Sequence, residues 1–194
     1  QAKYSELANL SVPDLGPGTW GGVRALNDVG QAAGTVMPSK LIGGDLPVMW
    51  TGTAVTQIPL LPGMSTGFPA SINNAGVVVG HQAAESVNGV PQEKAFQYRD
   101  GTVSELPLPA GYTWSRAVKI DDQGRVFGYA YNNNDRSRQV GVIWTDGVPS
   151  LAQSLVSPNE TWRVIEANGM DASGRILVHV YDPLAVGGPA LLVP

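Results

Sequence analysis

A short segment that occurs four times sets the strongest limit on what this chain can fold into. In each copy an apolar residue is followed by Asn or Asp, and a glycine lies four positions after the apolar residue. The copies are LNDVGQAAG at 26–34, INNAGVVVG at 72–80, IDDQGRVFG at 120–128 and MDASGRILV at 170–178. Their first glycines, Gly30, Gly76, Gly124 and Gly174, are 46, 48 and 50 residues apart. This period predicts one supersecondary unit repeated with connections of variable length.

Each unit contains the pattern of four short strands. The repeated segment is typical of a tight hairpin, because Asn or Asp begins a turn and glycine accepts the positive φ that the turn requires. In the first three units an apolar run then ends in an aromatic residue, and a second turn leads to a fourth strand. These aromatic residues are Trp50, Tyr98 and Trp144. Prolines lie in or beside the fourth strands, at Pro59, Pro107, Pro109 and Pro149. Since proline cannot donate to a sheet ladder, we expect the fourth strand at the edge of each sheet.

This pattern predicts an all-β fold, a four-bladed β-propeller of four-stranded antiparallel blades. The fourth unit has only three strand patterns, but Tyr4-Ser5-Glu6-Leu7 repeats Val103-Ser104-Glu105-Leu106 of the second unit. We therefore expect a ring that is closed by an N-terminal strand. A single domain over 1–194 would hold blades at about 21–61, 67–109, 115–155 and 162–194, with 3–12 as the closing strand. The competing interpretation is an open β-solenoid or a stacked array.

Composition narrows the class of partner. The chain has 12 basic and 16 acidic residues, with a net charge of −4, so it lacks the positive surface that nucleic acid or an anionic membrane requires. It has no cysteine, and no run of 18 apolar residues that could span a membrane. We expect a monomer with no nucleic-acid partner and no membrane span. The first residue is Gln1, which fits a chain processed during export.

The repeats resemble the extracellular repeats named HAF, in which an aliphatic-Asn-x-x-Gly-x-x-x-Gly turn precedes His-Ala-Phe and an aromatic-turn-Gly. The resemblance covers nearly the whole chain and is best in the second unit, where Ala95 and Phe96 match and Lys94 replaces the histidine. The first and third units also lack this histidine. HAF proteins are mainly bacterial secreted or surface proteins of undefined activity. The resemblance therefore implies a bacterial protein that is secreted, periplasmic or on the cell surface, and it carries over no catalytic residue.

Candidate binding residues lie on one face of the expected propeller. The connections between second and third strands are long and dissimilar, and such loops often carry function. His81, Tyr129 and His179 follow the second strand at equivalent positions, and a four-fold ring would set His81 opposite His179. A metal or an anion could bridge them, but two histidines fall short of a zinc ligand set, so we predict no metal and no cofactor. Aromatic rings on this face either pack between blades or form a ligand platform. The candidate ligand-binding residues are Trp20, His81, Tyr112, Trp114, Tyr129, Trp162 and His179.

The sequence carries none of the common catalytic motifs, such as a Gly-x-Ser-x-Gly elbow, a phosphate loop or a His-Glu-x-x-His pair. The first hypothesis is therefore an exported binding module that engages a protein or a glycan through its loop-rich face. The alternative is a carbohydrate-active hydrolase or lyase with a site at the propeller axis, where acidic residues near the candidate face could act in pairs. A purely structural spacer is the third hypothesis.

Overall fold

The computed structural model describes residues 10, 19–38, 44–87, 90–132, 135–182 and 187–194. Its strands form four antiparallel sheets, which we name A to D in chain order. Sheet A contains β1 (Trp20–Leu26), β2 (Gln31–Met37), β3 (Leu46–Thr51) and β4 (Ala54–Gln57). Sheet B contains β5 (Thr66–Ile72), β6 (Val78–Val87), β7 (Val90–Arg99) and β8 (Thr102–Glu105). Sheet C contains β9 (Trp114–Ile120), β10 (Val126–Asn132), β11 (Asp135–Thr145) and β12 (Val148–Leu151). Sheet D contains β13 (Arg163–Met170), β14 (Ile176–Tyr181) and β15 (Gly188–Leu192).

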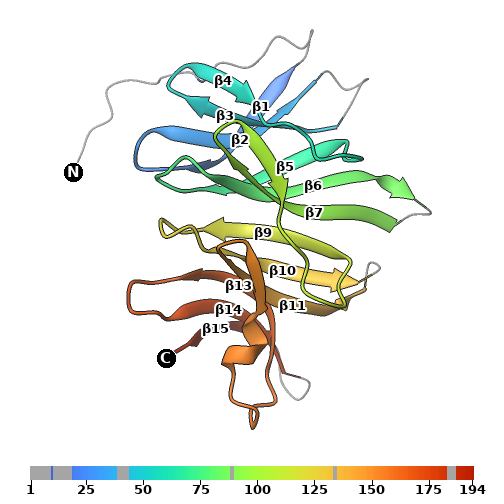
Figure 1. The fold of residues 1–194 in the computed structure, drawn as a ribbon, viewed down its shortest axis with the longest axis vertical. Helices are drawn as coiled ribbons and strands as arrows, with labels where there is room; N and C mark the ends of the chain where they lie inside the picture. Colours follow the sequence, from blue (N-terminus) through green and yellow to red (C-terminus); the bar gives the residue numbers. More distant parts are fainter. Residues whose placement is uncertain (1–9, 11–18, 39–43, 88–89, 133–134, 183–186) are drawn as a thin grey trace.

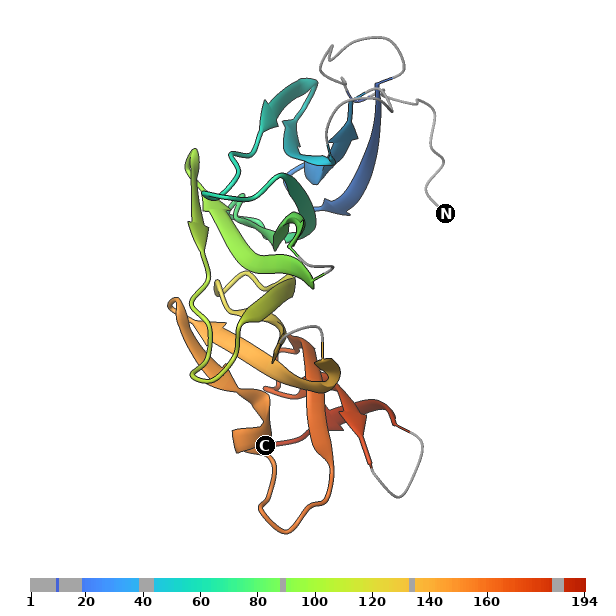
Figure 2. The same ribbon diagram turned by 90° about the vertical axis from the view of Figure 1, so that its right-hand side faces the viewer.

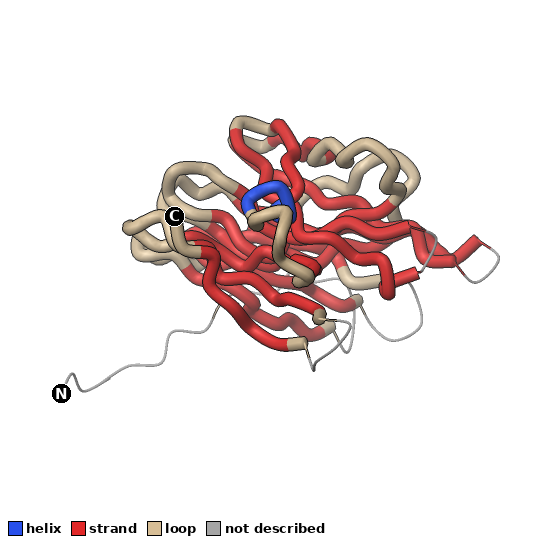
Figure 3. The backbone as a smooth tube through the Cα atoms, turned by 90° about the horizontal axis from the view of Figure 1, so that it is seen from below, coloured by secondary structure: helices blue, strands red, loops and turns tan. Residues whose placement is uncertain are grey.

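The all-β class and the four repeated sheets are confirmed. The fourth strand lies at the edge of sheets A, B and C, as expected, although of the four prolines only Pro149 lies within such a strand. Within the described residues, helical structure is limited to the 3-10 turn η1 (Ala152–Leu155), which is the blue segment of Figure 3.

Closure of the sheets into a ring is not confirmed. The sheets follow one another along the longest axis of the molecule, with sheet A at one end and sheet D at the other (Figures 1 and 2). Among the described strands, β15 pairs only with β14, so sheet D has three strands where the others have four. The expected closing strand, 3–12, lies outside the described residues except for Leu10.

Apolar side chains join each sheet to the next. Val79 of sheet B is fully buried in one cluster with Ala117, Val126 and Trp144 of sheet C. Equivalent clusters join sheets A and B around Ala33, and sheets C and D around Phe127. Since burying a large apolar side chain contributes about 1.5–3 kcal/mol, these clusters are the main source of stability in the row of sheets.

The repeated turns also form a hydrogen-bonded ladder from sheet A to sheet C. The side-chain amide of Asn27 donates to the Asn73 carbonyl at 2.9 Å, and that of Asn73 donates to the Asp121 carbonyl at 3.0 Å. Asp121 has no amide to donate, and its carboxylate instead accepts from Arg125 of its own turn at 2.6 Å. The Asn-to-Asp change in the repeat therefore turns a bond between sheets into a bond within one turn.

A close approach of backbones explains the second glycine of the motif. A Cβ on Gly80 would lie 2.1 Å from the Phe68 carbonyl oxygen, and Gly34 and Gly128 meet the same obstacle in sheets A and C. Sheet D has Val178 at this position, and β13 accommodates it with two register shifts against β14, where the first strands of the other sheets show one.

The expectation of long loops between second and third strands is wrong for two of the four units. In sheet B, β6 and β7 continue to Val87 and Val90, and in sheet C, β10 and β11 continue to Asn132 and Asp135. The physical reason is that the ladder continues through the polar residues, with Gln82 opposite Lys94 and Ala84 opposite Gln92. Sheets B and C therefore carry extended hairpins, and the corresponding connections of sheets A and D lie partly outside the described residues, at 39–43 and 183–186.

Candidate functional site

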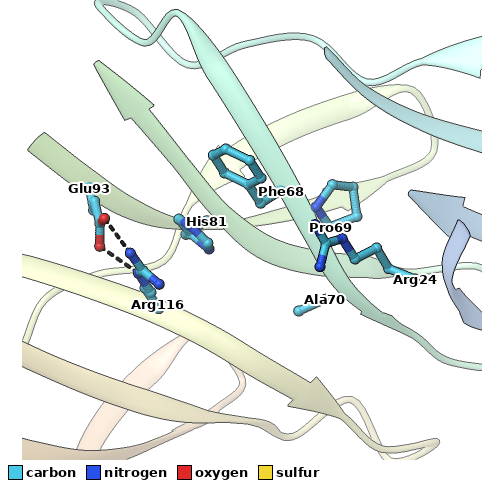
Figure 4. A pocket seen from close by; sticks show the side chains of 7 residues that line it. All are labelled: Arg24, Phe68, Pro69, Ala70, His81, Glu93 and Arg116. Atoms are coloured by element: carbon cyan, nitrogen blue, oxygen red, sulfur yellow. Dashed lines mark hydrogen bonds and ion pairs between the residues drawn. The ribbon is translucent and has the colours of Figure 1, made fainter. Parts of the chain in front are cut away.

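A cavity of about 620 Å³ lies along the first strands of sheets A, B and C. Three strands supply most of its wall, and His81 of β6 and Glu93 of β7 complete it (Figure 4). The lining residues are Arg24, Phe68, Pro69, Ala70, His81, Glu93 and Arg116. Because they come from three different sheets, the cavity exists only where consecutive sheets pack together.

A buried carboxylate fixes the position of one guanidinium in the cavity. Glu93 is 5% exposed, and the Nε of Arg116 donates to its Oε2 at 2.5 Å while Nη2 donates to Oε1. The Tyr131 hydroxyl, also buried, donates to the same Oε2 at 2.5 Å. A bidentate pair of this kind holds both side chains in one geometry. Arg116 is thus preorganised at the cavity wall.

The pKa values follow from this pairing. Burial alone would raise the pKa of Glu93, but the hydrogen bonds from Arg116 and Tyr131, together with the charges of Arg116 and His81, outweigh burial and lower it. The hydrogen bond to Glu93 raises the pKa of Arg116 above its ordinary value. Both groups are therefore charged throughout the neutral range.

An aromatic pair forms another part of the wall. Phe68 and His81 are directly opposite in the β5–β6 ladder, and their rings stack with centroids 5.0 Å apart at an interplanar angle of 23°. Arg24, at the bulge of β1, is exposed and points toward the cavity from sheet A (Figure 4). The cavity therefore combines a flat apolar wall with basic groups.

The pair of opposed residues at this repeat position differs between sheets B, C and D. Phe68 opposes His81 in sheet B, Arg116 opposes Tyr129 in sheet C, and Glu166 opposes His179 in sheet D. Burial raises the pKa of Glu166, and the charge of His179 only partly offsets this. Sheet D therefore presents an acid and an imidazole where sheets B and C present an aromatic pair and a base.

Of the residues predicted from the sequence, only His81 lines the cavity. Tyr129 is buried beside Arg116, and Tyr112 packs against the apolar cluster between sheets B and C. The indole nitrogen of Trp114 is buried and has no hydrogen-bond partner in the described part of the chain. The other three predicted residues lie outside the cavity, with exposed side chains: Trp20, Trp162 and His179.

The two histidines do not face each other in this arrangement. His81 belongs to sheet B and lies in the cavity beside sheet C, whereas His179 belongs to sheet D, and sheet C lies between them (Figure 1). Among the residues that the structure describes, no group of three or more histidine, cysteine or acidic side chains is placed to hold a metal ion.

The candidate residues predicted from the sequence do not include the cavity-lining residues Arg24, Phe68, Glu93 and Arg116. A usable signal was present in the repeat itself. Phe68, Arg116 and Glu166 occupy one repeat position yet differ completely in chemistry, although the next residue is apolar in each copy. A position that varies in this way within a regular unit serves something other than packing.

Comparison with known proteins leaves the function to be argued from the site. No family model matches the chain, and no curated protein matches its sequence. The helical part of the described structure contains no segment with the length and hydropathy needed to cross a membrane.

Proposed function

We propose that this protein is an exported binding module that holds a glycan in the cavity of sheets A, B and C. The observation that carries the proposal is the stacked pair of Phe68 and His81 beside the fixed guanidinium of Arg116. Flat rings contact the apolar faces of sugars, and fixed polar groups select the hydroxyl pattern. The resemblance to HAF repeats supports export.

Binding is favoured over catalysis by the state of the acidic group. Paired carboxylates about 5–10 Å apart carry out most glycoside hydrolysis. Among the described residues that line this cavity, Glu93 is the single acid, and both of its oxygens accept hydrogen bonds from Arg116 or Tyr131. Its lowered pKa also makes it a poor proton donor at neutral pH. This argues against the hydrolase alternative at this site.

A glycan array followed by calorimetric titration tests the proposal. We expect Phe68→Ala to weaken binding of the best glycan by about fivefold or more, because an aromatic contact contributes about 1 kcal/mol or more to such a site. Tyr181→Ala, which changes an exposed aromatic residue of sheet D, is the matched control and should bind normally. Equal weakening by both variants, or no binding to any glycan, would contradict the proposal.

We also propose a closed form of the protein in which sheets A and D, the two ends of the described row, come together and 3–12 supply the fourth strand of sheet D. The support is the pairing pattern of sheet B, where Ser104 opposes Gln97 and Gln97 opposes Val79. In sheet D, Leu177 takes the place of Val79 and opposes Leu191. Since Ser5 corresponds to Ser104 in the repeated sequence, Ser5 should lie opposite Leu191.

Two introduced cysteines test this pairing, because the chain has none of its own. Directly opposed residues of antiparallel strands are close enough for a disulfide. Ser5→Cys combined with Leu191→Cys should form a crosslink within one chain under mild oxidation, as should the control pair Gln97→Cys with Ser104→Cys. A crosslinked dimer would mean that the strand is exchanged between two copies. No crosslink, when the control forms one, would contradict the pairing.

A further inference from the structure

The cavity holds more positive than negative charge in a chain that is acidic overall. Arg24, His81 and Arg116 are its basic residues and Glu93 is its acid, whereas the chain as a whole has a net charge of −4. Glu93 is fully committed to Arg116 and Tyr131, so it neutralises Arg116 without presenting a free carboxylate to a ligand. The guanidinium of Arg24 remains as the uncompensated charge.

Arg24 is placed to meet a ligand and not to support the fold. Its side chain is exposed, and the described residues give it neither an ion pair nor a hydrogen bond. It extends from sheet A over the cavity, whose opposite wall is the Arg116–Glu93 pair on sheets B and C (Figure 4). The bonds to Glu93 use the Nε–H and one Nη2–H of Arg116, so both Nη1–H groups and the second Nη2–H remain for a ligand.

We propose that the ligand is an acidic glycan, a chain of uronic acid sugars, whose carboxylate binds to Arg24. This inference rests on the proposed function and names its ligand class. The planar fork of a guanidinium matches a carboxylate with two parallel hydrogen bonds. Phe68 and His81 both line this cavity, and aromatic rings can contact the apolar face of a sugar, which an acidic peptide does not offer.

The electrostatic setting strengthens this choice of ligand. A single uncompensated guanidinium can pair with one carboxylate through two parallel hydrogen bonds. One such contact is too few to hold a nucleic acid, which requires contacts to several phosphates. A uronic acid residue, with one carboxylate on each ring, fits this count.

The test uses the intact protein and trimers of galacturonic, glucuronic and mannuronic acid, each paired with its carboxyl-reduced trimer. Reduction keeps the ring and converts the carboxylate to an uncharged hydroxymethyl group. We expect at least one acid trimer to bind at least tenfold more tightly than its reduced counterpart. Arg24→Gln should remove this preference, and Arg24→Lys should retain part of it, because lysine keeps the charge and loses the fork. Arg99→Gln changes an exposed arginine of β7 outside the cavity and should leave binding unchanged.

Each failure has a separate meaning. If the reduced trimers bind as tightly as the acid trimers, or if Arg24→Gln binds normally, the acidic-ligand inference is wrong and the glycan-binding proposal stands. If no acid trimer binds while neutral glycans on the array do, the acidic-ligand inference is again wrong and the glycan-binding proposal again stands. If an oligoglutamate peptide binds at the cavity and no glycan does, both proposals are wrong and the partner is a protein. Unfolding curves of Arg24→Gln should match those of the unmodified protein, which excludes loss of fold as the cause.

Discussion

Sheets B and D arise from the same repeat, yet they differ at almost every position that matters for function. Val79 of sheet B is fully buried against sheet C, whereas Leu177, its equivalent in sheet D, is 45% exposed. The difference comes from the neighbours and not from the strand, because sheet B packs on both sides and sheet D packs on sheet C alone within the described residues. One pattern of apolar residues therefore produces a core in the middle of the row and an apolar surface at its end.

The same comparison explains where the candidate site lies. In sheet B, His81 stacks on Phe68 and faces the Arg116–Glu93 pair of the neighbouring elements. In sheet D, His179 lies opposite Glu166, whose pKa is raised by burial. The cavity around sheet B has walls from three sheets, whereas within the described residues sheet D packs on sheet C alone. Equivalent sequence positions thus acquire different chemistry from the sheets beside them.

The largest expected effect concerns the close backbone approach in sheet B. Gly80→Ala would place a Cβ 2.1 Å from the Phe68 carbonyl oxygen and 2.8 Å from the Cα of Pro69. Neither backbone atom can move without shifting β5, so we expect a loss of at least about 3 kcal/mol of unfolding free energy in urea titrations. Gly188→Ala in sheet D meets no atom within 4 Å and should change stability by less than about 0.5 kcal/mol. Similar losses of unfolding free energy in both variants would show that the two sheets tolerate an added Cβ equally well.

The next effect is a difference in stability cost between Glu93, which is buried, and Glu166, which is half-buried. Glu93→Gln removes the charge that pairs with Arg116, and the half-buried guanidinium then lacks its partner. We expect a loss of about 2 kcal/mol, less than for a fully buried pair because Arg116 keeps some exposure. Glu166→Gln replaces an acid whose pKa is raised by burial, so removing the charge should cost less than about 0.5 kcal/mol. Chemical denaturation at pH 7 compares them, and a greater cost for Glu166→Gln would reverse the comparison.

The sequence was sufficient for the sheets but not for the site. Periodic turn glycines such as Gly76 and aromatic residues such as Trp144 are local signals, and local signals predict hairpins and their order. The cavity depends on how three sheets sit together, which no spacing along the chain encodes. Arg24 and Arg116 lie far apart in the sequence, and only packing brings them to one cavity. The predicted meeting of the two histidines assumed a four-fold ring, which the described residues do not form.

A smaller effect concerns the ladder of turns. Asn73→Asp should behave like the natural aspartates of sheets C and D, because its side chain could no longer donate to the Asp121 carbonyl. The two oxygens would then face each other, and we expect a loss of about 1 kcal/mol in thermal or urea unfolding. The matched control is Asp171→Asn in sheet D, where the carboxylate pairs with Arg175 in an exposed turn. That control should leave the unfolding midpoint nearly unchanged, since exposed ion pairs contribute little. A stable Asn73→Asp variant would show that the ladder is dispensable.

The smallest effect is a difference in pH dependence between the two sheets. The pKa of Glu93 is lowered below 4.5 in the folded protein, so Glu93 contributes stability above pH 4.5 and loses it as the pH falls through the folded value. The pKa of Glu166 is raised above 4.5, so the folded state holds that proton more tightly than the unfolded state. Glu166 therefore contributes stability that is fully present below pH 4.5 and is lost as the pH rises through the raised value.

These opposite signs can be measured in urea titrations between pH 3 and pH 7. The stability gained on acidification from pH 7 to about pH 4.5 should be smaller in Glu166→Gln than in the unmodified protein. We expect this change in the urea midpoint to be smaller than the change caused by Asn73→Asp. Glu93→Gln should weaken the loss of stability below that pH, because the carboxylate that must be protonated there is gone. The result that would overturn this assignment is a Glu166→Gln variant with an unchanged profile above pH 4.5, since burial would then have no effect on the proton affinity of sheet D.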